Sequence, residues 1–200
     1  MIRVGVTGNI GSGKSTVCKL FSVLGIPVYH ADERAKWLLE NNNAIVNAVK
    51  ILLGNEAYNT NGKLNRPWIA SKVFANPGLL QQYNDIIHPA VLRDSENWMN
   101  AQRNVPYTIK EAALFIESGS YKQLDFIICV TAPESIRLQR IVKRDQASVD
   151  SIKARMASQM PEEEKVKKAH AVIVNDGKQE IIPQVWAIHH QLLQRQGLRL

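Results

Sequence analysis

Short apolar runs alternate with longer amphipathic segments along the chain. Five of these runs have the length and composition of β-strands, at residues 2–7, 26–30, 106–110, 125–131 and 171–174. Apolar residues recur at helical spacing in the segments between them. Alternating strands and helices are typical of a parallel sheet covered by helices on both faces. We therefore expect an α/β fold with a five-stranded, mostly parallel sheet.

The run at residues 126–130 is apolar at every position instead of at every second one. This pattern is typical of a central parallel strand that is buried on both faces. Just after the run, Thr131 and Glu134 have the spacing of a capping box, which predicts that Thr131 is the N-cap of the next helix.

Two helical segments interrupt the alternation. Residues 31–103 have no strand signal and are broken by Pro67, Pro77 and Pro89; we interpret them as an insertion that holds a second substrate near the carboxyl ends of the strands. Residues of about 136–168 are strongly basic, and we interpret them as a lid over bound phosphates. The rest, about 1–30, 104–135 and 169–200, would form the core of a single domain.

The bulk composition fits one core with appendages. The chain has 200 residues, 45% of them hydrophobic, and a formal net charge of +7. Such a charge suits nucleic acid, an anionic membrane or a small polyanion alike. Only Cys18 and Cys129 are present, with no disulfide framework or metal-ligand spacing. Because no targeting segment or membrane-length apolar stretch is visible, we expect a soluble, cytoplasmic protein.

The first apolar run leads directly into a phosphate-binding motif. Residues 8–15, Gly-Asn-Ile-Gly-Ser-Gly-Lys-Ser, match GxxxxGK[ST]. Glycines let backbone N–H groups wrap a polyphosphate, and the following helix presents its positive end to the same anion. Lys14 would contact the β- and γ-phosphates, Ser15 would bind Mg²⁺, and Thr16 would contact the α-phosphate. The predicted nucleotide-binding residues of this loop are Gly11, Ser12, Gly13, Lys14, Ser15 and Thr16.

Three classes of phosphate-loop protein compete: a small-molecule kinase, a GTPase switch and an ATPase that acts on nucleic acid. The GTPase strings Asp-x-x-Gly and Asn-Lys-x-Asp do not occur in the chain. A nucleic-acid motor normally interleaves aromatic residues with its basic surface, whereas only 6% of the residues here are aromatic. A kinase with a helical acceptor region and an arginine-rich lid fits best.

Sequence blocks along essentially the whole chain resemble the dephospho-CoA kinase family. Residues 6–16, VTGNIGSGKST, resemble the family's TGGIGSGKST, and the Ala-Asp pair at 31–32 follows. Further blocks occur in the family's order: VF at 73–74, HPAV at 88–91, LFIESG at 114–119, RIVKRD at 140–145, RMASQM at 155–160 and VIVN at 172–175. This ordered set is much more specific than the phosphate loop alone.

The resemblance implies transfer of the γ-phosphoryl group of ATP, with Mg²⁺, to the ribose 3′-hydroxyl of dephospho-CoA, the last step in making coenzyme A. It implies a three-layer phosphate-loop kinase fold with a helical CoA-binding insertion and a helical lid. The expected partner is dephospho-CoA, with no nucleic acid and no membrane. Two alternatives stay open: a kinase for another small acceptor such as a nucleoside monophosphate, and an NTP-dependent nucleic-acid-binding protein.

The resemblance also places Asp32 and His88 at the acceptor substrate. Asp32 would accept a hydrogen bond or the proton of the reacting hydroxyl; the alternative is a plain N-cap of a helix that begins at Glu33. His88 is a binding candidate only. The other histidines show no convincing metal-ligand spacing and are interpreted as structural: His30, His170, His189 and His190.

Two arginines of the basic segment are expected to bind the ATP phosphates. Arg140 would neutralise charge as the γ-phosphoryl group moves, which makes it a catalytic candidate with Lys14 and Asp32, and Arg144 would assist in binding. Both share one helical face with Arg137, so a solvated helix face is the alternative. Asn175 would lie near the ATP base, although Asn-Asp-Gly is also strong turn chemistry.

Two residues depart from the family's pattern. Glu111 stands where the family often has the Asp of Asp-x-Pro, and His170 stands where it has the Asp of an Ala-Asp pair. Any role of that second carboxylate cannot be carried over. Glu111 keeps a carboxylate that is one methylene longer, so its contact with Mg²⁺ stays open.

Overall fold

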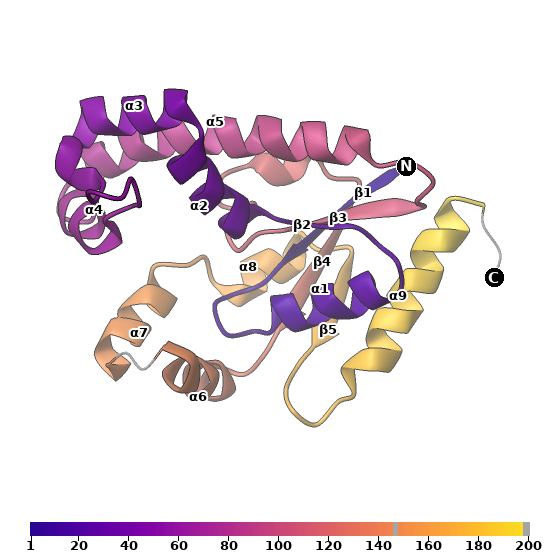
Figure 1. Ribbon diagram of the computed structural model, residues 1–200. Coiled ribbons are helices and arrows are strands. Elements are labelled where there is room, and N and C mark those ends of the chain that lie inside the picture. Colours follow the sequence, from indigo (N-terminus) through magenta and orange to yellow (C-terminus); the bar gives the residue numbers. More distant parts are fainter. Residues whose placement is uncertain (146–147, 198–200) are drawn as a thin grey trace. The chain divides into compact units, whose positions relative to one another are not determined.

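The computed structural model describes residues 1–145 and 148–197. In this part of the chain the strands form one five-stranded sheet, in the order β2-β3-β1-β4-β5, and every neighbouring pair is parallel (Figure 1). The strands are β1 (Ile2–Thr7), β2 (Val28–His30), β3 (Tyr107–Glu111), β4 (Phe126–Thr131) and β5 (Ala171–Val174). The predicted α/β fold and parallel sheet are confirmed.

The central strands are buried on both faces, as the apolar run predicted. Phe126, Ile128 and Val130 of β4 lie in the main hydrophobic core, whereas Ile127 lies in a second cluster with Phe115. This division follows from the alternation of side chains along a strand. A residue larger than glycine would not fit at Gly5 of β1 on this second face, because a Cβ there would come within 2.5 Å of Leu124, which packs against the same cluster.

The chain divides into two compact units, one made of Met1–His30 with the chain from Ala101 onward, and one made of Ala31–Asn100. The first unit holds the whole sheet, with α1 and α9 contributing to the main core. Its helices are α1 (Lys14–Val23), the 3₁₀ turn η2 (Ser120–Gln123), α6 (Glu134–Asp145), α7 (Val149–Ala157), α8 (Glu162–Lys167) and α9 (Ile181–Arg195).

The second unit is helical and has its own apolar cluster, which includes Leu38, Val49 and Ile69. Its helices are α2 (Ala31–Asn41), α3 (Asn43–Leu53), η1 (Asn55–Ala57), α4 (Arg66–Val73) and α5 (Pro77–Ala101). Pro67 and Pro77 lie in first turns, where a missing N–H costs nothing. Pro89 does not break the helical pattern, since it lies inside the 25-residue α5.

The predicted capping box is wrong, because Thr131 belongs to β4. Its backbone is in register with Val174 of β5, and its hydroxyl donates to the carbonyl of Ile173 at 3.5 Å. The next helix therefore begins later, at Glu134, directly after Pro133. Pairing with a strand that is distant in the sequence has overridden a local capping signal.

Both cysteines are buried and unpaired. Burial raises the pKa of each thiol, to about 12 for Cys129, so these thiols are inert core groups. Among the residues that the structure describes, no helix has the length and apolar character needed to cross a bilayer.

Candidate nucleotide-binding site

The phosphate loop joins β1 to α1, and its glycines are required by space as well as by backbone conformation. Gly11 has φ +81°, and a Cβ there would come within 2.7 Å of the Arg137 carbonyl oxygen. Gly13 has φ +99°, and a Cβ there would overlap the side-chain amide of Asn175. Both angles lie in the region that favours glycine. Arg137 of α6 and Asn175 after β5 therefore pack so closely against the loop that a side chain at either glycine would not fit.

The loop's polar groups suit a bound anion. Lys14 Nζ donates across the loop to the Gly8 carbonyl at 3.0 Å, and Ser15 and Thr16 are exposed in the first turn of α1. The buried Ser12 hydroxyl has no hydrogen-bond partner among the described residues. A buried hydroxyl without a partner is costly, so a ligand that accepts from it would remove a penalty.

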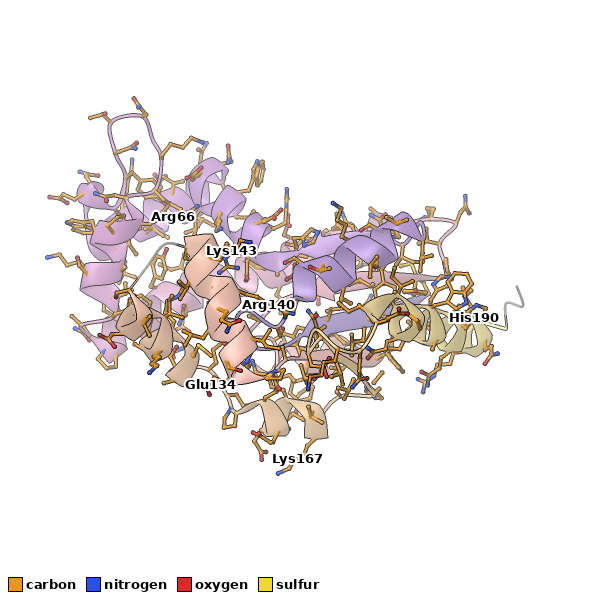
Figure 2. All side chains as sticks on the ribbon, turned by 90° about the horizontal axis from the view of Figure 1, so that it is seen from below. Arg66, Glu134, Arg140, Lys143, Lys167 and His190 are labelled. Carbon is orange, nitrogen blue, oxygen red and sulfur yellow. The ribbon has the colours of Figure 1, made fainter. Side chains whose placement is uncertain are left out.

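Arg140 of α6, labelled in Figure 2, and Asn175, which follows β5, both contact the loop although they are distant from it in the sequence. Arg140 Nη1 is 3.4 Å from the carbonyl oxygens of Gly11 and Ser12, and Nη2 donates to the Asn175 side-chain oxygen at 3.0 Å. Asn175 Nδ2 in turn donates to the Ser12 carbonyl at 2.7 Å. The structure therefore brings both predicted residues to the phosphate loop.

The predicted arginine face divides into three environments. Arg137 is buried, and its Nε donates to the Ala132 carbonyl at 3.0 Å. Arg144 is exposed and bonds to Asp145 through Nε at 2.6 Å, while Arg155 Nη1 reaches the same carboxylate at 2.7 Å. These two guanidinium groups lower the pKa of Asp145 to about 2. In this state Arg144 is engaged by Asp145, and only Arg140 contacts the loop by a described hydrogen bond.

Glu111, at the end of β3, has a carboxylate within hydrogen-bonding distance of Ser15. Its Oε1 accepts from Ser15 Oγ at 3.4 Å, and its Oε2 lies 2.6 Å from His30 Nδ1. Its side chain is only 13% exposed. This pair was not predicted from the sequence, where Glu111 is a departure from the family's pattern and His30 is interpreted as structural. The sequence indicated only that each residue lies at or just after the end of a predicted strand, the edge where ligands of parallel sheets bind. That the two strands are neighbours comes from the structure.

The donor set fits Mg²⁺ held jointly with nucleotide phosphates. Mg²⁺ prefers oxygen ligands and is usually bound by one or two protein groups plus phosphate and water. A serine hydroxyl and a carboxylate meet this requirement at Ser15 and Glu111. No cluster of three or more acidic, histidine or cysteine residues in the described ranges 1–145 and 148–197 could hold a metal alone.

The structure also contains a buried ion pair that was not predicted from the sequence. Lys165 of α8 is 0% exposed, and its Nζ lies 2.7 Å from Glu117 Oε1 and donates to the Ala113 carbonyl at 2.9 Å. Nearby, Gln159 Oε1 accepts from the N–H of Ile10 in the phosphate loop at 2.8 Å. These contacts tie the segment before α8, and α8 itself, to the core of the first unit.

The two predicted acceptor residues lie in the second unit. Asp32 is exposed in the first turn of α2, which begins at Ala31, so the alternative that it is an N-cap before Glu33 is wrong. His88 lies on α5, where partial desolvation lowers its pKa, against the opposing effect of the Asp85 carboxylate. A lowered pKa keeps the imidazole neutral near pH 7, so it can donate or accept a hydrogen bond.

Comparison with known proteins gives one consistent result. The family model described as dephospho-CoA kinase matches residues 2–180. The dephospho-CoA kinase of Bacteroides fragilis strain YCH46 is 40% identical over 184 residues, covering 92% of this chain and 89% of that protein. The enzyme of Porphyromonas gingivalis is 40% identical over 186 residues, covering 92% of this chain and 91% of that protein.

Solved structures agree. A Thermus thermophilus crystal structure superposes with a TM-score of 0.83 at 34% identity, covering 96% of this chain and 97% of that one. Dephospho-CoA kinase from Campylobacter jejuni gives 0.72 at 26% identity, covering 96% and 98%. Shikimate kinase from Acinetobacter baumannii, at 0.57 and 16% identity over 98% and 94%, shares the fold. The chain is a phosphate-loop kinase that belongs to the dephospho-CoA kinase family.

Proposed function

We propose that this chain transfers the γ-phosphoryl group of ATP to the ribose 3′-hydroxyl of dephospho-CoA and so completes coenzyme A. The observation that carries the proposal is the loop at residues 8–15, which α6 and Asn175 contact, in a chain that belongs to this kinase family. Phosphoryl transfer needs positioning and charge neutralisation more than covalent help from the protein. The residues around the loop supply both.

The phosphate chain of ATP would bind the N–H groups of the loop and the positive end of α1. The binding residues would be Gly11, Ser12, Gly13, Lys14, Ser15 and Thr16. Lys14 would exchange its present partner, the Gly8 carbonyl, for the β- and γ-phosphates. A phosphate oxygen would also give the buried Ser12 hydroxyl the partner that the described residues do not supply.

Arg140 would neutralise charge on the transferring group from its place against the loop. Asn175, which joins Arg140 to the Ser12 carbonyl, would hold that guanidinium and border the ATP base. Arg144 would bind phosphate after leaving the Asp145 carboxylate, an exchange of one anion for another of higher charge.

Mg²⁺ would be held by the Ser15 hydroxyl, with Glu111 beside it, and when bound it supplies positive charge next to the β- and γ-phosphates. Asp32 would accept the hydrogen bond, and then the proton, of the acceptor hydroxyl. The hydroxyl oxygen forms the new bond to the γ-phosphorus while the bond from that phosphorus to the β,γ-bridging oxygen breaks, and ADP leaves. His88 would contribute a hydrogen bond to the acceptor substrate.

The test is an ADP-release assay with Mg²⁺ and ATP across a panel of acceptors. Dephospho-CoA should be preferred to AMP, CMP, shikimate and gluconate. A preference for a nucleoside monophosphate would instead support a kinase for another acceptor. Binding to DNA at physiological salt should be weak, because Lys14, Arg140 and Arg144 would bind the phosphates of a small molecule instead. A cytoplasmic location fits substrates of this kind.

A further inference from the structure

We infer that His30 is a positioning residue for phosphoryl transfer, because it holds Glu111 so that the carboxylate faces Ser15 and the Mg²⁺ bound there. The inference rests on the proposed function, since it concerns the metal that accompanies ATP. It assigns a role to a histidine that the sequence indicated as merely structural.

The backbone places the two residues together. His30 ends β2 and Glu111 ends β3, and the two are direct partners in the parallel register. Side chains at paired positions lie on the same face of a sheet. Tyr29, which is 2% exposed, and Lys110, which is 4% exposed, form the preceding pair. A buried pair fixes the register, so the contact between His30 and Glu111 does not depend on a loop.

The hydrogen bond defines which carboxylate oxygen is used. His30 Nδ1 lies 2.6 Å from Glu111 Oε2, and an ionised carboxylate only accepts, so Nδ1 carries the proton. Oε2 is thereby occupied, and Oε1 is left for Ser15 Oγ at 3.4 Å. One imidazole N–H thus orients the whole carboxylate toward the serine.

This constraint is needed because glutamate has one more rotatable bond than aspartate and can present its carboxylate in more directions. A group beside the carboxylate that fixes its rotamer removes that freedom before Mg²⁺ arrives. His30 suits this role because the sheet holds it in place, and the carboxylate that it contacts is largely buried, with the Glu111 side chain 13% exposed.

The experiment compares two substitutions of the same shape. His30→Asn keeps an N–H near the position of Nδ1, whereas His30→Leu removes it. The first readout is the dissociation constant of Mn²⁺, a probe for Mg²⁺, from the complex with a non-hydrolysable ATP analogue, measured by electron paramagnetic resonance of free Mn²⁺. His30→Leu should weaken Mn²⁺ binding about tenfold or more, the scale for loss of such a supporting partner, and His30→Asn should recover most of it.

Two controls sharpen the result. Glu111→Gln should weaken Mn²⁺ binding by itself, and adding His30→Leu to it should have no further effect, because the carboxylate to be positioned is gone. His190→Leu makes the same substitution on α9, away from Arg140 (Figure 2), and should leave Mn²⁺ binding unchanged. Thermal melts establish that each variant is folded.

Three outcomes overturn the inference: unchanged Mn²⁺ binding in His30→Leu, equal loss in His30→Asn and His30→Leu, or additive losses in the double variant. A fall in kcat with unchanged Mn²⁺ binding would also overturn it and would indicate proton transfer instead. Failure of the proposed function is a separate result, namely no phosphorylation of dephospho-CoA by the unaltered enzyme. The Mn²⁺ comparison is informative in either case.

Discussion

The buried Lys165 gives a sharp test of how the region around α8 is held to the core. Its side chain is 0% exposed, and its Nζ is satisfied by Glu117 and by the Ala113 carbonyl. Lys165→Met keeps an unbranched apolar stem in the same space but removes the charge. The substitution leaves the carboxylate and the carbonyl without their common partner, and a polar group that loses its partner in a buried place destabilises the folded state.

The expected loss follows from the burial of each member. Removing one partner of a buried ion pair costs about 3–5 kcal/mol when the other charge stays buried. Glu117 is 23% exposed, so water recovers part of its solvation once Lys165 is gone. We therefore expect Lys165→Met to lower the free energy of unfolding by about 2–3 kcal/mol. Adding Glu117→Leu should restore part of this stability, because no unpaired charge then remains.

The assay is urea unfolding followed by circular dichroism, with Lys167→Met as the matched control. Lys167 lies on the same helix, and both side chains of its 2.6 Å ion pair with Glu164 are exposed. Loss of this ion pair should therefore leave the urea midpoint of unfolding unchanged. The reasoning is refuted if Lys165→Met unfolds at the same urea concentration as the unaltered chain. It is also refuted if the two substitutions destabilise equally.

Three further outcomes are expected. Lys14→Ala should lower turnover at least about a hundredfold without changing the melting temperature; near-normal turnover would show that residues 8–15 do not form the catalytic phosphate-binding site. Asp32→Asn should lower turnover about a hundredfold while ATP affinity stays and stability moves by less than about 1 kcal/mol, measured by steady-state kinetics beside a thermal melt. Arg144 and Arg155 hold the pKa of Asp145 at about 2, below its ordinary 3.8, so the ionised carboxylate stabilises the folded chain above about pH 4. The stability advantage over Asp145→Asn should therefore disappear as the pH falls toward 2, and a constant difference in acid unfolding curves would contradict this.

Local patterns were sufficient for the parts of the fold that depend on neighbouring residues. The bounds of β1 and β5 agree with the predicted strands, and the phosphate loop follows β1 as the motif requires. The apolar run of β4 indicated burial on both faces, because a strand that is buried on both faces is apolar at consecutive positions. The predicted end of this strand at Thr131 also agrees, but the helix start that the capping box predicted there is wrong, because Thr131 pairs with Val174 of β5 and α6 begins at Glu134.

The pair of His30 and Glu111 could not be read from the sequence for the same reason. The two residues are 81 positions apart, and only the register of β2 with β3 makes them neighbours. Each alone has an ordinary alternative, a histidine before a helix and a glutamate at a strand end. Helical spacing likewise placed Arg137, Arg140 and Arg144 on one face, but it could not indicate that their partners would be a carbonyl, the phosphate loop and a carboxylate.

The phosphate loop shows why a motif can be recognised without being explained. Its pattern fixes where glycine occurs, whereas the structure gives two reasons for glycine at Gly11 and Gly13: their positive φ angles, and the close approach of Arg137 on α6 and of Asn175 just after β5. Those two segments also bring Arg140 to the loop carbonyls. The space around Gly11 and Gly13 and the position of Arg140 therefore depend on the same packing. A change that loosens α6 should impair both ATP binding and charge neutralisation, even if every residue of the motif is intact.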